Sequence, residues 1–155
     1  MRVGEYFDKP ESSFLIIEKD LEKIVDRMLK NPRLLKLLYY READALSKPS
    51  LTNAQKMKLI NNEIKIVPYL AIDKDCPTFV VVTFDNFTPN AKHGYYRDCT
   101  LSFDILCHPD HWNLGNYQLR PYKIAGEIDA MFNQAKMTGI GTLTFIGANN
   151  LVLNE

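Results

Sequence analysis

The segment best equipped for chemistry is the run Cys107-His108-Pro109-Asp110-His111. Cysteine thiolate and imidazole are both zinc ligands, and Cys99 could lie near them. A structural zinc site normally takes four ligands in two pairs, and the sequence offers no second pair, because His93 is the only other histidine. We therefore expect no metal and interpret the run as a polar loop at the end of a strand. The alternative is a small metal-dependent enzyme that uses Cys107, His108, Asp110 and His111.

Carboxylates offer a second kind of chemistry, because acidic side chains gathered on a sheet can hold magnesium, as they do in nucleases. Asp98 and Asp104 share one face of a strand, but their spacing corresponds to about 20 Å along it, so they cannot share one ion. The sequence holds no nucleophile elbow, phosphate loop or dinucleotide fingerprint. Cys76 lies in an acidic stretch, which disfavours a reactive thiolate. We expect a protein that is not an enzyme and uses no cofactor.

The element that would carry these residues is a strand with strict alternation. Cys99, Leu101, Phe103, Ile105 and Cys107 alternate with polar residues from Asp98 to Asp104. A period of two means that one face of the strand is buried and the other faces water. Leu101, Phe103 and Ile105 are therefore predicted core residues, and both cysteines are predicted to serve packing.

A helix is predicted to follow over residues 120–135. Pro121 suits its first turn, and Gly139 and Gly141 end the region. Helical spacing places five apolar residues on one buried stripe, of which three are taken as core. The stripe consists of Ile124, Ile128, Met131, Phe132 and Ala135, and the core residues among them are Ile124, Ile128 and Phe132.

The first half of the chain is predicted to be mainly helical. Residues 14–30 carry an apolar stripe, Asn31-Pro32 can cap and start a second helix, and Thr52 with Gln55 forms a capping-box pattern. Strands are expected over Ile64–Ile72 and Thr78–Phe84, a loop over Phe87–Gly94, and a closing hairpin in which Thr142–Ile146 and Leu151–Leu153 flank Gly147–Asn150.

This order of elements predicts the fold class. Segregated helices and strands favour an α+β fold with a mostly antiparallel sheet, N-terminal helices, and a crossing helix packed on one face. We expect one such domain over residues 14–155, preceded by a flexible N-terminal arm over residues 1–13, because those residues include few apolar side chains.

Aromatic residues gather near the predicted loops and element ends. Five of them, together with Lys92 in the predicted hairpin loop 85–96, are assigned to an interface with other subunits or partners, because Tyr and Trp are enriched in interface cores. They are Phe87, Tyr95, Tyr96, Trp112 and Tyr117. The alternative is that these rings only complete the core.

Charge and composition narrow the class of protein. Nineteen basic residues balance nineteen acidic ones, so nothing attracts phosphate or a membrane surface over long range. Three cysteines without a secretory signal indicate a reduced, intracellular setting, and no apolar run approaches the length of a membrane span. Nearly neutral proteins associate readily, which suits a subunit of an assembly.

The pattern as a whole resembles the neck and tail-terminator ring proteins of tailed bacteriophages, the head-tail connector proteins. Tyr96–Ile105 is similar to the central strand of that family, and the Arg120-Pro121-Tyr122-Lys123-Ile124-Ala125 segment resembles the start of its crossing helix. The composition, rich in Asn, Lys and Ile, is similar to that of AT-rich phages, including the crAss-like group. The helices predicted near residues 32–39 and 53–62 depart from the simplest form of the family.

The resemblance implies a structural role in the virion. Copies would form a homo-oligomeric ring between the portal and the tail, dock on neighbouring portal, connector and tail proteins, and continue the DNA channel without sequence-specific binding. The chain would be made in the host bacterial cytoplasm and would contact no membrane. An intracellular adaptor or binding module of another system is the remaining alternative.

Overall fold

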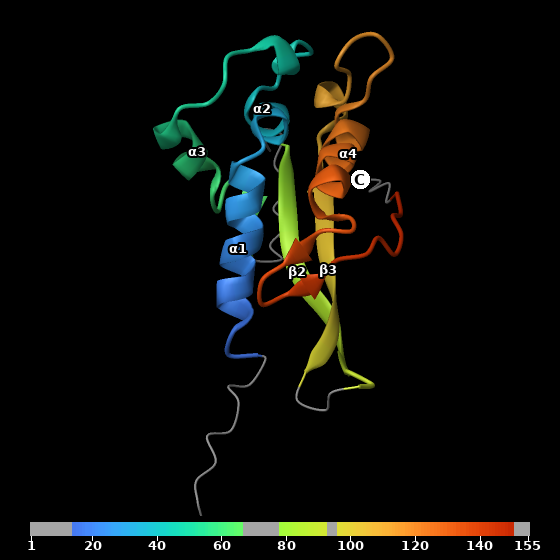
Figure 1. Ribbon diagram of the computed structural model, residues 1–155. Helices are drawn as coiled ribbons and strands as arrows, with labels where there is room; N and C mark the ends of the chain where they lie inside the picture. The colour runs from blue at the N-terminus through green and yellow to red at the C-terminus, as the bar shows by residue number, and fades with distance from the viewer. Residues whose placement is uncertain (1–13, 67–77, 93–95, 151–155) are drawn as a thin grey trace, which may run out of the picture.

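The computed structural model describes residues 14–66, 78–92 and 96–150. Helices cover one face of a small sheet, and two long strands extend as a ribbon beyond the helical layer (Figure 1). The α-helices are α1 (Ile17–Leu29), α2 (Pro32–Tyr39), α3 (Asn53–Leu59) and α4 (Arg120–Phe132), and the short 3-10 helices are η1 (Ala45–Ser47) and η2 (Pro109–His111). The strands are β1 (Ile64–Lys65), β2 (Phe79–Pro89), β3 (Arg97–Leu106), β4 (Lys136–Met137) and β5 (Gly141–Thr142).

Local sequence signals start helices α2 and α3 as predicted. The side chain of Asn31 accepts hydrogen bonds from the backbone N–H groups of Arg33 and Leu34, and Pro32 occupies the first position of α2. Thr52 and Gln55 form a reciprocal capping box at the start of α3. These caps satisfy backbone donors that lack partners within the helix, so the boundaries follow directly from the residue types.

The main sheet has the order β1-β2-β3. Strands β2 and β3 are antiparallel, with Val80 opposite Ile105 and Val82 opposite Phe103, whereas the two-residue strand β1 runs parallel to β2. A second sheet consists of the antiparallel pair β4 and β5. The predicted α+β class with a mostly antiparallel sheet is therefore confirmed.

The core lies between β2–β3 and the three helices α1, α2 and α4. Val80 and Val82 of β2 join the cluster of buried helix residues, and the predicted residues Ile124, Ile128 and Phe132 of α4 belong to it. The other predicted core residues, Leu101, Phe103 and Ile105, are half-buried and pack against this cluster. Their position follows from β3 being the last strand of the sheet, with only one strand beside it. The Phe103 ring stacks on Phe132 with centroids 5.1 Å apart.

Two predicted boundaries in the ribbon and the crossing helix are corrected, and so is the predicted packing of Cys99. Strand β2 continues through Phe87 to Pro89, where a loop was expected, and a bulge between Asp85 and Thr88 accommodates the change of register. Cys99 is exposed, although the alternation of the strand places it on the same face as Leu101 and Phe103. Helix α4 ends at Phe132, before Ala135.

The predicted closing hairpin is wrong in its position. The hairpin forms earlier, between β4 and β5, because Gly139 and Gly141 adopt positive φ angles of 86° and 104° that favour glycine. A Cβ on Gly139 would lie 2.6 Å from Nζ of Lys23, but that flexible side chain can move aside, so the positive φ angle is the stronger reason for glycine at this position. Residues 143–150 form no strand.

Some expectations lie outside the described residues. They are the N-terminal arm over residues 1–13, most of the strand predicted over Ile64–Ile72, the second strand Leu151–Leu153, and the residues Cys76, His93 and Tyr95. Among the residues that are described, no helix combines the length and the apolar character needed to cross a bilayer.

Candidate functional site

The strand-end segment that opened the sequence analysis begins at the end of β3. Cys107 is half-buried, and its Sγ lies 3.3 Å from Oγ1 of Thr78, which is hydrogen-bonding distance. Burial raises the pKa of the Cys107 thiol, although Thr78 and Arg120 oppose the shift. The thiol therefore stays protonated at neutral pH, so it is neither a strong nucleophile nor a ready metal ligand.

The two histidines of the segment have different surroundings. Nδ1 of His108 accepts a hydrogen bond from the backbone N–H of Asp110 at 3.3 Å and so caps η2. Nδ1 of His111 is buried and has no hydrogen-bond partner. Burial lowers the pKa of His111, and the charges of Arg41 and Arg120 lower it further. His111 is therefore held neutral beside two arginines.

The geometry provides no support for the metal alternative. Over residues 14–66, 78–92 and 96–150, no three His, Cys, Asp or Glu side chains gather closely enough to hold a metal ion. Asp98 and Asp104 both lie on the exposed face of β3, but six positions apart in the strand. The segment from Cys107 to His111 is best described as a loop that fixes the end of β3.

Arg120 is a residue of the same region that sequence reasoning missed. Its side chain is fully buried, and its guanidinium donates hydrogen bonds of 2.6–2.9 Å to five backbone carbonyl groups. The acceptors are the carbonyl oxygens of Leu37, Tyr40, Arg41, Glu42 and His111. Arg120 thus ties the C-terminal end of α2 and the end of η2 to the start of α4.

A signal for Arg120 was present in the sequence. Arg120 lies four residues before Ile124, and Ile128 and Phe132 continue the same spacing of four on the buried stripe of α4. A charged residue at a core position of a helix must have polar partners, because burying an unpaired charge is costly. The unpaired carbonyl groups at the C-terminal end of α2, together with the negative end of its dipole, meet that need.

The predicted interface residues fall into two separate groups. Phe87, Lys92 and Tyr96 lie toward the tip of the ribbon, where Lys92 and Tyr96 are exposed and Phe87 is half-buried against the ring of Phe14, 4.9 Å away. Trp112 and Tyr117 lie in the connection between η2 and α4. Trp112 is 39% exposed and uses its Nε1–H to donate to the carbonyl of Cys107.

Tyr117 has the most unusual conformation in the second group. Its side chain is 104% exposed, so it contacts essentially nothing in the folded chain. Gly115, Asn116 and Tyr117 adopt φ angles of 78°, 50° and 59°, a run of left-handed residues that is unfavourable for a bulky side chain. The loop therefore holds an aromatic ring in solvent on a strained backbone.

Tyr117 borders an open hollow of about 520 Å³ on the first half of α4. Its other lining residues include Arg33, Tyr122, Lys123 and Glu127, and Tyr122 is 56% exposed. We call the surface formed by Arg33, Tyr117, Tyr122 and Lys123 the tyrosine surface. Exposed tyrosines next to arginine are the composition of binding hot spots.

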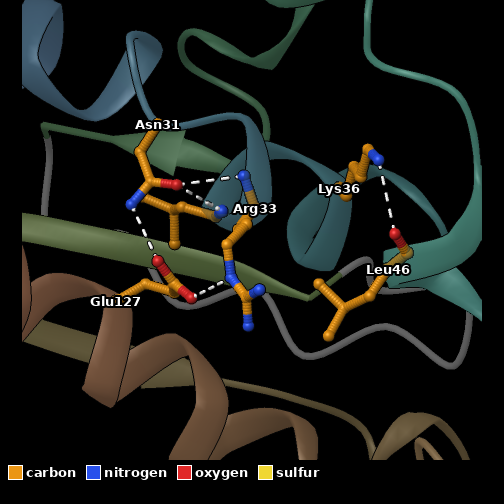
Figure 2. Close-up of polar contacts among 6 residues, drawn as sticks. Asn31, Arg33, Lys36, Leu46 and Glu127 are labelled. Atoms are coloured by element: carbon orange, nitrogen blue, oxygen red, sulfur yellow. Dashed lines mark hydrogen bonds and ion pairs between the residues drawn. The ribbon is translucent and has the colours of Figure 1, made fainter.

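A polar network sets the edge of the tyrosine surface. Glu127 of α4 accepts hydrogen bonds from Nδ2 of Asn31 at 3.0 Å and from Nε of Arg33 at 2.6 Å, as Figure 2 shows. Burial alone would raise the pKa of Glu127, but the hydrogen bonds from Asn31 and Arg33 outweigh it, so the pKa is lowered. The cap of α2 is thereby joined to α4, which holds the surface rigid.

Comparison with known proteins gives one match. The model of the YomW family matches residues 31–155, which include α2, the whole ribbon and α4. No curated protein and no solved structure matches the chain.

Proposed function

Because the chain belongs to the YomW family, whose name points to a phage-associated protein, we propose that it is a structural ring subunit of a phage neck or tail terminator. Copies of the chain join the portal or connector to the tail and continue the DNA channel. The role is architectural and involves no catalysis or cofactor. The protein is made in the cytoplasm of the host bacterium and becomes part of the virion.

The observation that carries this proposal is the tyrosine surface. Tyr117 stands on a left-handed backbone with its side chain fully exposed, so its ring gains no packing within the described part of the chain. Strained residues of this kind cluster where a protein binds something. A partner that covers Tyr117 and Tyr122 would supply the missing contacts, and Arg33 and Lys123 would give polar contacts at the rim.

The balance of charge agrees with a channel subunit. Nineteen basic and nineteen acidic residues leave no net charge to grip the phosphates of passing DNA. Affinity for DNA comes mostly from phosphate contacts, so a neutral subunit binds it weakly. DNA can then move through the ring without sequence-specific binding.

The test measures assembly. Light scattering of the wild-type chain, alone and with the portal, connector and tail proteins of the same phage, is expected to show a species heavier than the monomer. Tyr117→Ser and Tyr122→Ser should each weaken assembly by about tenfold or more, as the loss of a hot-spot residue does. Met57→Ser is the matched control, because Met57 is an exposed apolar residue on α3, away from the tyrosine surface.

Two outcomes would count against the proposal. A strict monomer that enters no complex with any of these proteins contradicts the ring role. A single dominant partner of non-phage origin, with no closed ring, would favour an adaptor instead.

A further inference from the structure

We propose that the tyrosine surface of one copy binds an acidic stripe on helix α1 of the next copy, so that these two surfaces join neighbouring subunits. This inference rests on the proposed ring role and states which surfaces meet. The acidic stripe consists of Glu18, Glu22 and Asp26, which are all exposed. It lies on α1, whereas the tyrosine surface lies on α2, on α4 and on the loop before α4 (Figure 1).

The free polar groups of the tyrosine surface include several donors. Only Nε of Arg33 is engaged by Glu127, so the two Nη groups of Arg33 remain free to donate (Figure 2). The hydroxyl of Tyr122 accepts a hydrogen bond from Nδ2 of Asn150 at 3.1 Å, which leaves its own proton free to donate. Within the described residues, Lys123 forms no ion pair.

The hollow has little of its own to satisfy these donors. Glu127 is the one acidic residue that lines it among the residues that the structure describes, and Glu127 already accepts two hydrogen bonds. Hydrogen bonds from a cationic donor to a carboxylate are stronger than those between neutral groups. The tyrosine surface therefore suits a partner that brings carboxylates.

The sequence of α1 places opposite charges on two neighbouring stripes. Residues four apart share a face of a helix, so Lys19, Lys23 and Arg27 form a basic stripe beside the acidic one. The basic stripe turns toward the rest of the chain, because Nε of Arg27 donates to the carbonyl of Met131 at 2.8 Å. Each acidic residue stands one position earlier, about 100° further round the helix. The acidic stripe therefore faces a different side from α4.

The acidic stripe lacks cationic partners of its own. Lys23 is paired with Asp20 at 2.7 Å, and no ion pair in the described part of the chain includes a residue of the stripe. Like charges four residues apart on a helix repel one another. A cationic surface on another subunit would relieve that repulsion. Leu15, which is 67% exposed and lies three residues before Glu18, adds an apolar side chain that tyrosine rings can cover.

Charge complementarity makes a second copy the occupant of the tyrosine surface. The chain has no net charge, but its charges are segregated, since every copy carries both the acidic stripe and the cationic hollow. A contact between two different surfaces repeats from copy to copy and closes into a ring when the rotation permits. The charges select the partner and its orientation, and the rings of Tyr117 and Tyr122 supply the buried area.

Two charge-reversal variants test this contact. Glu22→Lys changes the central residue of the acidic stripe, and Lys123→Glu changes the cationic hollow. Each variant alone should assemble about tenfold more weakly than the wild type or worse, because like charges then face each other between copies. Light scattering over a dilution series measures assembly, with the portal, connector and tail proteins present if the wild type requires them.

Mixing the two variants provides the decisive measurement. In an equimolar mixture, alternating copies again meet opposite charges on both sides, so assembly should return to within about threefold of the wild type. Misfolding cannot produce this result, because a misfolded chain would not be rescued by another variant. Asp104→Lys is the matched control, since it reverses an exposed charge on β3 outside both surfaces and should assemble like the wild type.

The outcomes separate the joining surfaces from the function. Assembly of both variants at the wild-type level overturns the contact but leaves the ring role intact. A defect in only one variant, or a defect that mixing does not repair, means that a different acidic segment occupies the tyrosine surface, which also overturns the inference. Absence of any wild-type assembly, alone or with phage partners, contradicts the proposed function together with the inference.

Discussion

At the scale of single residues, Arg120 connects parts of the chain that are far apart in sequence. Five carbonyl acceptors surround one guanidinium, and they come from residues 37–42 and from His111. No other side chain offers five donors in one planar group. Burial lowers the pKa of Arg120, but arginine keeps its proton in proteins, so the cation is stabilised by these carbonyl groups.

Arg120→Lys is expected to destabilise the fold although it conserves the charge. An ammonium group has three donors, so at least two of the five carbonyl groups lose their partner, and the free energy of unfolding should fall by about 2–4 kcal/mol. Urea titration measures this change. Arg33→Lys is the control, because the Arg33 side chain is 60% exposed in its pair with Glu127, and its effect should be below about 0.5 kcal/mol. If Arg120→Lys were as stable as the wild type, the five hydrogen bonds of Arg120 would not be what stabilises this region.

His111 should make the stability of the protein sensitive to mild acid. Its pKa is lowered from 6.5 in the folded state, so the unfolded chain takes up a proton first as the pH falls. Neutral His111 therefore makes its full contribution to stability above about pH 6.5, the ordinary pKa that the unfolded chain shows. That contribution is lost as the pH falls toward the lower pKa of the folded state. His111→Asn should reduce the loss of stability between about pH 7.5 and about pH 5.5, measured by urea titration. An identical pH dependence in the variant would show that His111 is not responsible.

At the scale of elements, the ribbon depends on the register of β3. Phe103 faces the helices and stacks on Phe132, whereas Asp104 faces solvent. Phe103→Asp should lower the free energy of unfolding by about 3 kcal/mol or more, because it places an unpaired charge against the core. Asp104→Asn is the control and should change stability by less than about 0.5 kcal/mol. Circular dichroism during thermal unfolding distinguishes them, and a normally folded Phe103→Asp would refute the register.

At the scale of the whole molecule, the tyrosine surface should contribute to association and not to folding. Tyr117→Gly removes a fully exposed ring and places at φ 59° the residue that tolerates this angle best. Glycine relieves backbone strain in the folded state, which stabilises the protein, but it also gives the unfolded chain more freedom, which destabilises the fold. Because the two effects oppose each other, the free energy of unfolding should change by less than about 1 kcal/mol. Assembly should nevertheless be lost. A large loss of stability would mean that Tyr117 supports the fold instead.

Local signals explain what the sequence by itself determined about this protein. The caps at Asn31 and Thr52 and the apolar spacing of α1, α2 and α4 predicted the helices, and strict alternation predicted the register of β3 at Leu101, Phe103 and Ile105. These features depend on residues that are close together in the chain, and the repeat of the helix or strand determines which of them share a face. The α+β class followed from their order.

Only the tertiary structure decided the features that join distant segments. Four of the five carbonyl partners of Arg120 lie about eighty positions away in the chain, and Asn31 and Arg33 reach Glu127 of α4 across more than ninety positions. Cys99 is exposed, although the alternation of its strand places it on the core face. The turn between β4 and β5 formed at Gly139 and not at Gly147, where Gly139 and Gly141 adopt the positive φ angles that the turn requires. Each of these outcomes depends on contacts between elements, which no periodicity within one element encodes.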